Sequence, residues 1–208
     1  MTERTHLLRC RCGTVHGSVV LPALGQAVCY CKDCRAYAHF LKREGDILDD
    51  AGGTQVVAQL PGRVRLDADG LDALACVTFT GRVLRWYASC CNTPVGNTAA
   101  SAKVPYVGLV HTCLDADPAQ SLEASFWPVR MRVNTESATK PVAPTPLVAA
   151  AVMLGSAPSM LKARLDGSWR GNPFFDAVSG KPIREPRRID AGERWKLKSR
   201  AAAEVARP

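Results

Sequence analysis

Aromatic residues and histidines are scarce in this chain of 208 residues. Thirteen residues are aromatic and four are histidine. No histidine has a second histidine three or four residues away, which excludes a helical histidine pair as the basis of a metal site. His39 lies five residues after Cys34, and we interpret it as a surface or supporting side chain rather than a ligand. Any metal site is therefore expected to rest on cysteine.

The sequence also lacks a long uninterrupted apolar segment. Its N-terminus shows neither an apolar signal region nor a small-residue cleavage site, so we expect no secretory leader and a cytoplasmic protein. The longest apolar run, residues 147–161, is broken by Gly155, Ser156, Pro158 and Ser159. Because about 20 apolar residues are needed to cross a bilayer, we expect no membrane span and no membrane partner.

Acidic residues are too few to balance the basic ones, and the excess is uneven. The net charge is +8. Residues 160–208 carry twelve Lys or Arg against six Asp or Glu, whereas residues 1–159 carry fifteen against thirteen. We interpret this basic tail as a solvated extension. Aromatic residues hardly interleave with its charges, so we do not expect it to bind nucleic acid.

Short segments rich in valine and aromatic residues predict a mainly β core. Seven strands are expected, at residues 15–20, 26–30, 55–60, 74–79, 82–87, 106–111 and 128–133. A short helix is expected after Cys34, because Ala38 and Leu41 follow it at helical spacing. Residues 92–98 have the composition of a loop.

The last third of the chain is predicted to be an extension with its own helix. Residues 140–146 are rich in proline and predict a linker. Thr145 followed by Pro146 is a typical helix start, which predicts a helix at about residues 145–165. We expect at most partial order in the last 20 residues. The chain is thus predicted to divide into a domain at residues 1–139 and a helical or irregular extension at residues 140–208.

Nine cysteines are many for a cytoplasmic protein. Disulfides are not expected in a reducing compartment, and the short Cys-x-Cys and Cys-x-x-Cys spacings favour metal binding instead. Cys76 and Cys113 lie in predicted strands and are interpreted as core residues. The other seven form three clusters: Cys10 and Cys12; Cys29, Cys31 and Cys34; Cys90 and Cys91.

The spacing within these clusters predicts zinc ligands. Residues i and i+2 of a strand point to the same side, so Cys10 with Cys12, and Cys29 with Cys31, can bind one ion together. The triplet of Cys29, Cys31 and Cys34 leaves two alternatives. Three thiolates can form an open catalytic site with a free position, or a fourth cysteine from elsewhere can close the site.

These motifs resemble those of the glutathione-dependent formaldehyde-activating enzyme family, whose domain is shared with centromere protein V. The resemblance covers roughly residues 8–135, rests on residues 8–17, 29–35 and 84–95, and is closest to a bacterial branch of that superfamily. It implies an antiparallel β-tent that holds one structural and one reactive zinc ion. Carried over residue by residue, the structural ion would be held by Cys10, Cys12 and Cys91. The reactive ion would be held by Cys29, Cys31 and Cys34.

The third of these stretches departs from the family pattern. The family has Cys-x-x-Cys-Gly there, whereas this chain has Ala88 in place of the first cysteine and Asn92 in place of the glycine. Cys90 could complete the structural site only through a tight bend, because neighbouring residues of an extended chain point to opposite sides. We therefore expect one or two zinc ions, with Cys90 as a possible further ligand.

The resemblance also implies an activity. It predicts a zinc-dependent carbon–sulfur lyase that acts on a thiol adduct, such as glutathione plus formaldehyde giving S-hydroxymethylglutathione. Cys29, Cys31 and Cys34 would be its catalytic residues, and a small-molecule thiol would be its partner. The sequence assigns no general acid. The alternative is a non-enzymatic zinc domain with a closed triplet, which binds a partner or nucleic acid through its basic tail.

Overall fold

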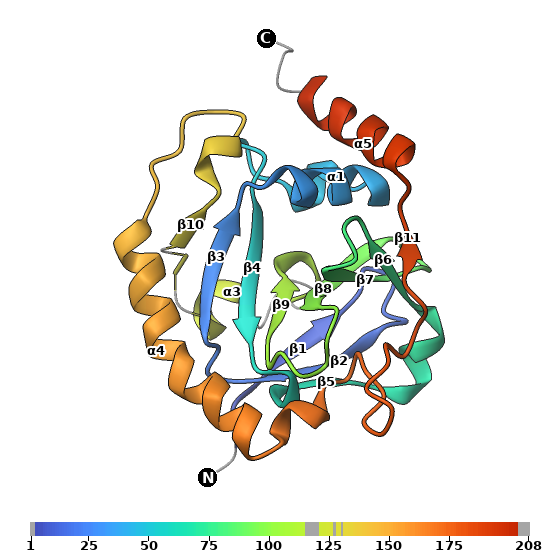
Figure 1. Cartoon of the computed structure of the whole chain (residues 1–208), viewed down its shortest axis with the longest axis vertical. Helices are drawn as coiled ribbons and strands as arrows, with labels where there is room; N and C mark the ends of the chain where they lie inside the picture. Colours follow the sequence, from blue (N-terminus) through green and yellow to red (C-terminus); the bar gives the residue numbers. More distant parts are fainter. Residues whose placement is uncertain (1–2, 115–120, 127, 130, 204–208) are drawn as a thin grey trace.

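The computed structural model describes residues 3–114, 121–126, 128–129 and 131–203. Its core consists of two β-sheets that pack face to face (Figure 1). The smaller sheet has the strand order β1-β2-β5, formed by Thr5–Arg9, His16–Val20 and Val64–Leu66. The larger sheet has the order β10-β3-β4-β9-β8-β7-β6-β11. Its strands are, in that order, Met131–Val133, Gly25–Cys29, Thr54–Gln59, Val107–Val110, Thr93–Ala99, Val83–Ala88, Leu74–Thr78 and Arg187–Arg188.

Strand pairing in the larger sheet is antiparallel except at its two edges. The outer strands β10 and β11 pair in parallel with β3 and β6. Six of the seven predicted strands are confirmed to within one residue at each end. The seventh, predicted at residues 128–133, is a strand only at Met131–Val133, and residues 127 and 130 lie outside the described part.

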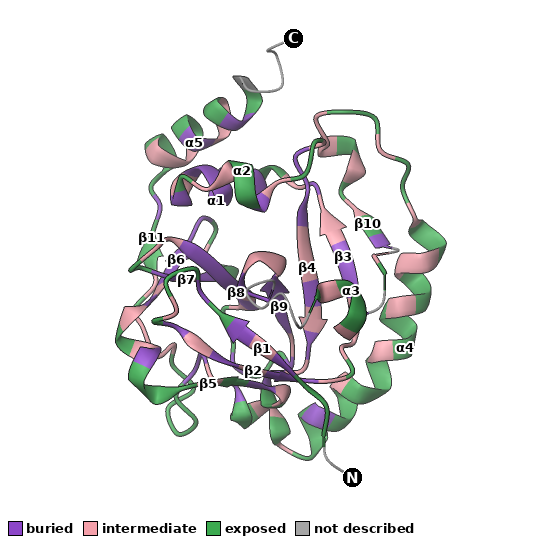
Figure 2. Ribbon diagram, turned by 180° about the vertical axis from the view of Figure 1, so that it is seen from behind, coloured by how far each residue is buried: buried purple, intermediate pink, exposed green. Residues whose placement is uncertain are grey.

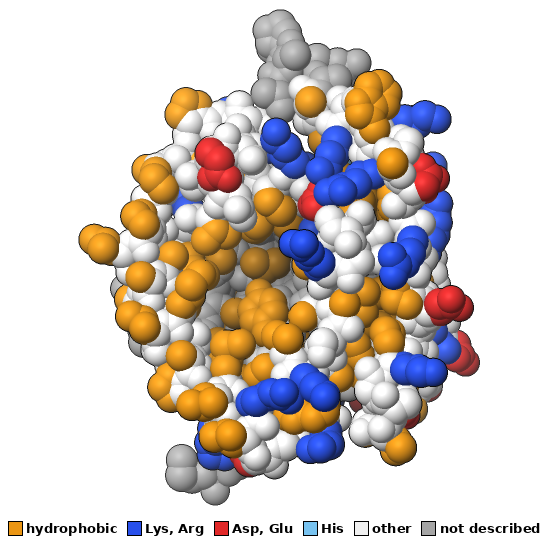
Figure 3. All heavy atoms as spheres, in the orientation of Figure 1, with side chains coloured by type: hydrophobic (Ala, Val, Ile, Leu, Met, Phe, Trp, Pro, Cys, Tyr) orange, Lys and Arg blue, Asp and Glu red, His pale blue; other side chains and the backbone are white. Residues whose placement is uncertain are grey.

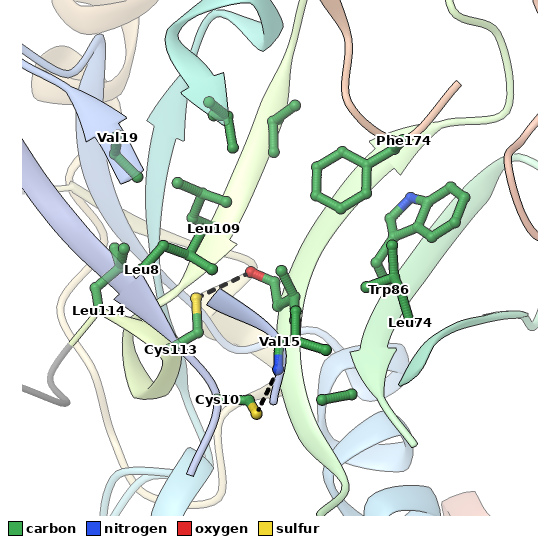
Figure 4. Close-up of a cluster of buried hydrophobic side chains, with 14 of the residues drawn as sticks. Leu8, Cys10, Val15, Val19, Leu74, Trp86, Leu109, Cys113, Leu114 and Phe174 are labelled. Atoms are coloured by element: carbon green, nitrogen blue, oxygen red, sulfur yellow. Dashed lines mark hydrogen bonds between the residues drawn. The ribbon is translucent and has the colours of Figure 1, made fainter. Parts of the chain in front are cut away.

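The main core lies between the two sheets. Leu8 and Val19 of the small sheet belong to the same buried cluster as Val57, Trp86 and Leu109 of the large sheet. Figure 4 shows Leu8 beside Leu109, and Figure 2 shows the buried stretches of the strands on this side. Alternate residues of a strand face the same side of a sheet, so the apolar alternation of β4, β7 and β9 creates one apolar face.

The other face of the large sheet is partly covered by α1, Lys32–Leu41. Its buried side chains Tyr37 and Leu41 pack with Val77 and Val110 of the sheet. The helix ends at Lys42, which has the left-handed conformation (φ 55°) and caps it. The helix predicted after Cys34 is therefore confirmed, with Cys34 in its first turn.

The remaining helices are mostly short. α2 is Glu44–Ile47 and α3 is Leu122–Ser125. Short 3₁₀ helices occur at Pro61–Arg63, Ala68–Ala73, His111–Cys113, Thr135–Ser137 and Ser168–Gly171.

The long helix predicted near residue 145 is confirmed as α4, Pro146–Leu165. It continues through Gly155 and Pro158, and it runs alongside β10 and β3 at the edge of the sheet (Figure 1). Among the described residues it is the one helix long and apolar enough to cross a membrane, judged by length and composition alone. Such a match is weak evidence of a span.

Of the last 20 residues, for which partial order was predicted, the structure describes residues 189–203. Ala191–Ala203 forms the helix α5, which packs on α1. Asp33 of α1 lies 3.2 Å from the Arg194 guanidinium and 2.8 Å from the Lys198 ammonium. These two ion pairs dock α5 on the domain, and the composition of the tail alone does not indicate such a docking partner.

The segment after residue 139 also enters the main core. Phe174 is fully buried, and its ring centroid lies 5.0 Å from that of Trp86. β11 extends the large sheet beyond β6. The division at residue 139 stays a prediction about independent folding, but side chains from both sides of it share one core.

The core is mainly β, as predicted, and it carries cysteine clusters that could bind metal. Helical residues (36%) nevertheless outnumber strand residues (28%), because α4 and α5 add helix outside the sheets. The β-tent itself stays a prediction. The loop predicted at residues 92–98 was wrong except at Asn92, since β8 occupies residues 93–98 and pairs with both β7 and β9. Thr93, Val95 and Thr98 are buried there, which outweighs the turn-forming composition.

Candidate metal centres

Four thiols from two distant segments meet at one end of the sheets. Cys10 and Cys12 follow β1, while Cys90 and Cys91 lie in the turn between β7 and β8. Their four Sγ atoms all lie within 4.8 Å of one another. The Sγ of Cys12 is 3.5 Å from that of Cys10 and 3.1 Å from that of Cys90, and the Cys90 and Cys91 Sγ atoms are 3.8 Å apart.

Two tight turns bring these side chains together. Gly13 has a φ of 84°, which lets the chain reverse directly after Cys12. Asn92 has a φ of 54°, and the Cys91 amide donates to the Ala88 carbonyl at 3.4 Å. This is the bend that the sequence required if Cys90 was to join the cluster. Cys90 therefore joins Cys91 in the cluster. Ala88, which stands where the family pattern has a cysteine, is buried in β7.

The thiols of this cluster differ in how readily they ionise. The Thr14 hydroxyl and amide hydrogen-bond the Cys12 sulfur and lower the pKa of that thiol to about 6. Burial raises the pKa of Cys10 above its usual value. In the absence of a cation, the Cys12 thiol therefore ionises easily, whereas the Cys10 thiol tends to stay protonated.

The second cluster holds three thiols at the start of α1. Cys29 ends β3, Cys31 caps the N-terminus of the helix, and Cys34 lies in its first turn. The Cys34 Sγ is 3.1 Å from the Cys31 Sγ and 3.7 Å from the Cys29 Sγ. In the parts of the chain that the structure describes, no fourth Cys, His, Asp or Glu completes this group.

Ionisation in the triplet is centred on Cys31. Hydrogen bonds from the thiols of Cys29 and then Cys34 lower the pKa of Cys31 far below its usual value. The same contact with Cys31 is the main cause that raises the pKa of Cys29. The pKa of Cys34 is raised well above its usual value by its hydrogen bonds with Cys29 and Cys31 and by burial. One thiolate is therefore shared by two thiols when no cation is bound.

A buried arginine lies behind the triplet. Both terminal nitrogens of Arg85 approach the Cys34 Sγ, at 3.8 and 3.9 Å. Nη1 also donates to the Asn97 side-chain oxygen at 3.1 Å. The guanidinium packs over the rings of Tyr37 and Phe79, with its central carbon 5.2 and 5.7 Å from their centroids. This fixed positive charge stabilises thiolates on the inner side of the cluster.

The outer side of the triplet is lined by polar groups. The Asn134 amide nitrogen donates to the Cys29 Sγ at 3.3 Å, and this residue is exposed in a left-handed conformation (φ 56°). Tyr106 directly precedes β9 and interacts electrostatically with Cys29 and Cys34. Burial, and then the charges of Cys29 and Cys34, raise the pKa of its phenol to about 12.

The two remaining cysteines and His39 are buried side chains. Cys76 and Cys113 are confirmed as core residues, with 4% and 0% of their surface exposed. The Cys113 thiol donates to the Val95 and Val110 carbonyls, so it is not a ligand of either cluster. His39 is buried rather than at the surface, and its Nδ1 lies 3.1 Å from a Glu44 carboxylate oxygen.

Arg85, Asn134 and Tyr106 were missed by sequence reasoning. The sequence carries one signal for Arg85. It lies in a predicted strand between the apolar residues Leu84 and Trp86, so its side chain points to the opposite face from theirs, which is the face that α1 covers. Asn134 carried no signal, since it lies 105 residues from Cys29.

Both thiol groups fit a zinc ion by their chemistry. Zinc bound by cysteines at about 2.3 Å in a tetrahedron separates neighbouring sulfur atoms by about 3.8 Å. The sulfur–sulfur distances of 3.1 to 3.8 Å in both clusters are of this size. Thiolate ligands favour soft or borderline cations. Cys10, Cys12, Cys90 and Cys91 can hold one ion, and Cys29, Cys31 and Cys34 another.

The fold and the two cysteine clusters define a mainly β protein with two candidate metal centres. A comparison with protein families matches residues 2–186 to a family of unknown function, DUF6151, and the chain belongs to this family. A search of curated proteins finds no match. The matched segment includes all seven clustered cysteines, Arg85 and Asn134, and it extends into the C-terminal segment as far as Pro186.

Proposed function

We propose that the protein binds two zinc ions and uses the one at the triplet as a zinc-dependent carbon–sulfur lyase acting on a thiol adduct. The reaction would join glutathione and formaldehyde to S-hydroxymethylglutathione, or separate them. The observation that supports this proposal is the unequal number of thiols. Four meet at one cluster and three at the other, and structural zinc sites are closed by four protein ligands whereas catalytic sites keep one position open.

The two cysteines that could have closed the triplet are engaged elsewhere. Cys90 belongs to the four-thiol cluster, and the Cys113 thiol is buried in the core. A closed triplet was the central expectation of the non-enzymatic alternative. Within the described ranges no other candidate ligand replaces them. The open position supports a site that takes a ligand from solution.

The charge of the triplet supports a thiol as that ligand. A zinc ion bound there would act as a Lewis acid that keeps a substrate sulfur ionised near neutral pH. Three thiolates and a divalent cation carry a net charge of −1, which would disfavour a further thiolate. Arg85 lies within 3.9 Å of the Cys34 Sγ and restores neutrality. The Asn134 amide can orient a polar group at the outer edge, since it already donates to Cys29.

The chemical step requires a proton donor. The substrate sulfur attacks the carbonyl carbon of formaldehyde, a carbon–sulfur bond forms, and the carbonyl π electrons move to oxygen, which takes a proton. In this proposal Tyr106 gives that proton. The Tyr106 hydroxyl packs against Gly108 of β9. Gly108 lies opposite Asn97 of β8, and the Asn97 side chain accepts a hydrogen bond from Arg85 beside the triplet. With a pKa raised to about 12, the phenol keeps its proton until a more basic oxygen forms.

The basic tail offers little support for the alternative function. Arg194 and Lys198 pair with Asp33, Arg184 pairs with Asp72, and Arg187 pairs with Glu193. These pairs lie within the folded chain, so much of the tail charge is matched internally. A partner that binds the tail would have to compete with them.

The experiment is an exchange measurement on the full-length, zinc-loaded protein. Carbon-13 formaldehyde and glutathione exchange with their adduct spontaneously, so magnetisation-transfer NMR compares the exchange rate with and without the protein. We expect acceleration by the wild type, loss with Cys31→Ser, and a large loss with Tyr106→Phe. Cys90→Ser is the matched control, because it removes a thiol from the other cluster.

Metal content is measured on the same samples. If the wild type holds two zinc ions and exchange is no faster than in buffer, the lyase proposal is wrong and the triplet binds thiols without catalysis. If the triplet holds no zinc in any sample, the metal assignment itself fails. Acceleration that survives Cys31→Ser would place the activity elsewhere in the molecule.

A further inference from the structure

α4 exposes large apolar side chains along its whole length. Leu147, Leu154 and Leu165 expose 85%, 74% and 78% of their surface, and Met153 and Leu161 expose 61% and 60%. These five make up more than half of the exposed large hydrophobic residues in the described part of the chain. The others are spread over the surface: Val83, Val104, Val178 and Trp195. A concentration of this kind on one helix indicates a contact surface.

The exposed side chains form one continuous stripe. Steps of three and four residues keep side chains on the same face of a helix. Figure 3 shows hydrophobic side chains along the outer edge that α4 forms. Six exposed residues follow these steps from the first turn to the last: Leu147, Ala151, Leu154, Pro158, Leu161 and Leu165.

The opposite face of α4 is fixed to the domain. Val152 packs so closely on β3 that a Cβ added at Gly25 would lie 2.8 Å from its Cγ1, and Ala163 is buried. At the start of the helix, the Arg132 amide donates to the Thr145 hydroxyl at 2.8 Å. A helix held along its length lies flat on the domain, whereas a membrane span would have to detach from it.

The charged residues within α4 are all basic. The helix contains no Asp or Glu, and its last turn carries Lys162 and Arg164. Asp166 directly after the helix pairs with Lys162 at 2.6 Å. Arg164 and Arg170 pack over the ring of Trp169, at 5.8 and 4.6 Å from its centroid. Basic side chains grouped around a tryptophan beside an apolar stripe are typical of helices at a lipid interface.

The apolar surface is wider than a helix-pairing seam. Leu147 and Ala151 also line a cleft of about 610 Å³ between α4 and the start of β3, which reaches Leu24, Pro128 and Met131. In paired helices, complementary charges beside the apolar seam set partner choice and orientation, and α4 has no acidic residue to offer a second copy. A broad apolar face with basic residues is instead complementary to an anionic lipid surface.

From these features we infer that α4 is a docking surface for an anionic membrane. The helix lies in the plane of the membrane, with its stripe of leucines at the boundary of the acyl chains and with Lys162 and Arg164 at the phosphate headgroups. This inference is independent of the zinc proposal. It makes the protein a peripheral membrane protein that keeps its two sheets and both thiol clusters in water.

The test is flotation of the full-length, zinc-loaded protein with phosphatidylcholine vesicles that either contain or lack phosphatidylglycerol. We expect binding to the anionic vesicles that weakens as salt is added. Replacing Leu154→Glu and Leu161→Glu together should lower the bound-to-free ratio by about tenfold or more, because both side chains leave the acyl boundary. Replacing Lys162→Gln and Arg164→Gln should weaken binding to anionic vesicles and leave neutral vesicles unaffected.

Val178→Glu is the matched control, because Val178 is 97% exposed and lies outside α4. All variants are compared by thermal unfolding, and the exposed positions should leave the melting temperature unchanged. Equal binding by the double leucine variant and by the control would overturn the inference. So would a dimer that forms without vesicles and disappears in the leucine variant, since it would identify a second copy as the occupant. Attachment that resists high salt and alkaline washing would indicate a span instead.

Discussion

At the scale of single residues, Cys90 changes the ligand count of the four-thiol cluster. The sequence indicated three ligands and a missing fourth, because Ala88 stands where a cysteine is expected. The left-handed Asn92 turns the chain so that Cys90 and Cys91 approach the same point, with sulfur atoms 3.8 Å apart. Local backbone conformation, which the sequence indicates only weakly, therefore decides whether this site is complete.

We predict that Cys90→Ser selectively weakens metal binding at the four-thiol cluster. Cys90 is exposed, so the change removes a ligand without opening a cavity. Zinc affinity at this cluster should fall at least about tenfold, while the triplet keeps its ion. Competition with a coloured chelator measures both sites. Cys76→Ala is the control, because it removes a cysteine from the core and leaves both clusters intact. Unchanged affinity in Cys90→Ser would show that three thiols suffice there.

Arg85 is the residue on which the charge of the triplet depends. Replacing it with methionine fills a similar volume but removes the positive charge next to Cys34, so the triplet affinity for zinc should fall by about 10- to 100-fold. Arg85→Lys keeps the charge and should recover part of the loss, although it cannot reproduce the two contacts of the guanidinium. Equal affinities in the two variants would mean that the packing of Arg85 matters and its charge does not.

Proton release on metal binding follows from the pKa pattern of the triplet. Cys31 has a lowered pKa, whereas those of Cys29 and Cys34 are raised. Near neutral pH a metal must therefore displace about two protons, and its affinity should rise with pH and fall in acid. The measurement is calorimetry in buffers of different ionisation enthalpy, on a chain with Cys12→Ser and Cys90→Ser so that only the triplet loads. Release of no protons would contradict the pattern.

At the scale of elements, the contact between α1 and α5 joins the triplet region to the end of the chain. Asp33 is next to Cys34 and pairs with both Arg194 and Lys198. Burial alone would raise the pKa of Asp33, but these two pairs outweigh it and lower the pKa. The pairs are partly exposed, so each contributes on the order of 1 kcal/mol or less.

We predict that Asp33→Asn loosens α5 without unfolding the sheets. The side chain keeps its shape and loses its charge, so the amide protons of α5 should exchange faster by up to about fivefold, while those of β4 and β9 should not change. Hydrogen exchange followed by mass spectrometry separates these regions. Glu136→Gln is the neutralising control, because Glu136 belongs to neither α1 nor α5. Faster exchange in the central strands would show that α5 stabilises the whole fold.

Elements differ in how far the sequence determines them. The strands with alternating apolar residues, such as β4 and β7, were predicted to within one residue, because burial of one face fixes their register. β8 was missed because Asn92, Pro94, Gly96 and Asn97 have the composition of a turn, whereas two neighbouring strands supply its hydrogen bonds. The cysteine pairs follow from spacing along the chain. Arg85 and Asn134 reach the triplet through pairing across the sheet, which spacing does not reveal.

At the scale of the whole molecule, the question is whether residues 1–139 fold alone. The sequence predicted a boundary there from its proline-rich segment. In the structure Phe174 is fully buried against Trp86, and Phe175 lies 6.2 Å from the same ring. Loss of one buried phenylalanine costs about 3–5 kcal/mol, a large part of the 5–15 kcal/mol that stabilises a typical domain.

A chain that ends at residue 139 is therefore expected to unfold without cooperativity or to be unfolded in water. A chain that ends at residue 190 keeps Phe174, Phe175 and β11 and loses only α5, so it should unfold cooperatively with a slightly lower midpoint. Urea denaturation followed by circular dichroism distinguishes the two. If the shorter chain unfolds in one sharp transition, the core between the sheets is sufficient without Phe174, and the C-terminal segment is an accessory that covers it. If only the longer chain does so, both thiol clusters depend on a segment that the sequence assigned to an extension.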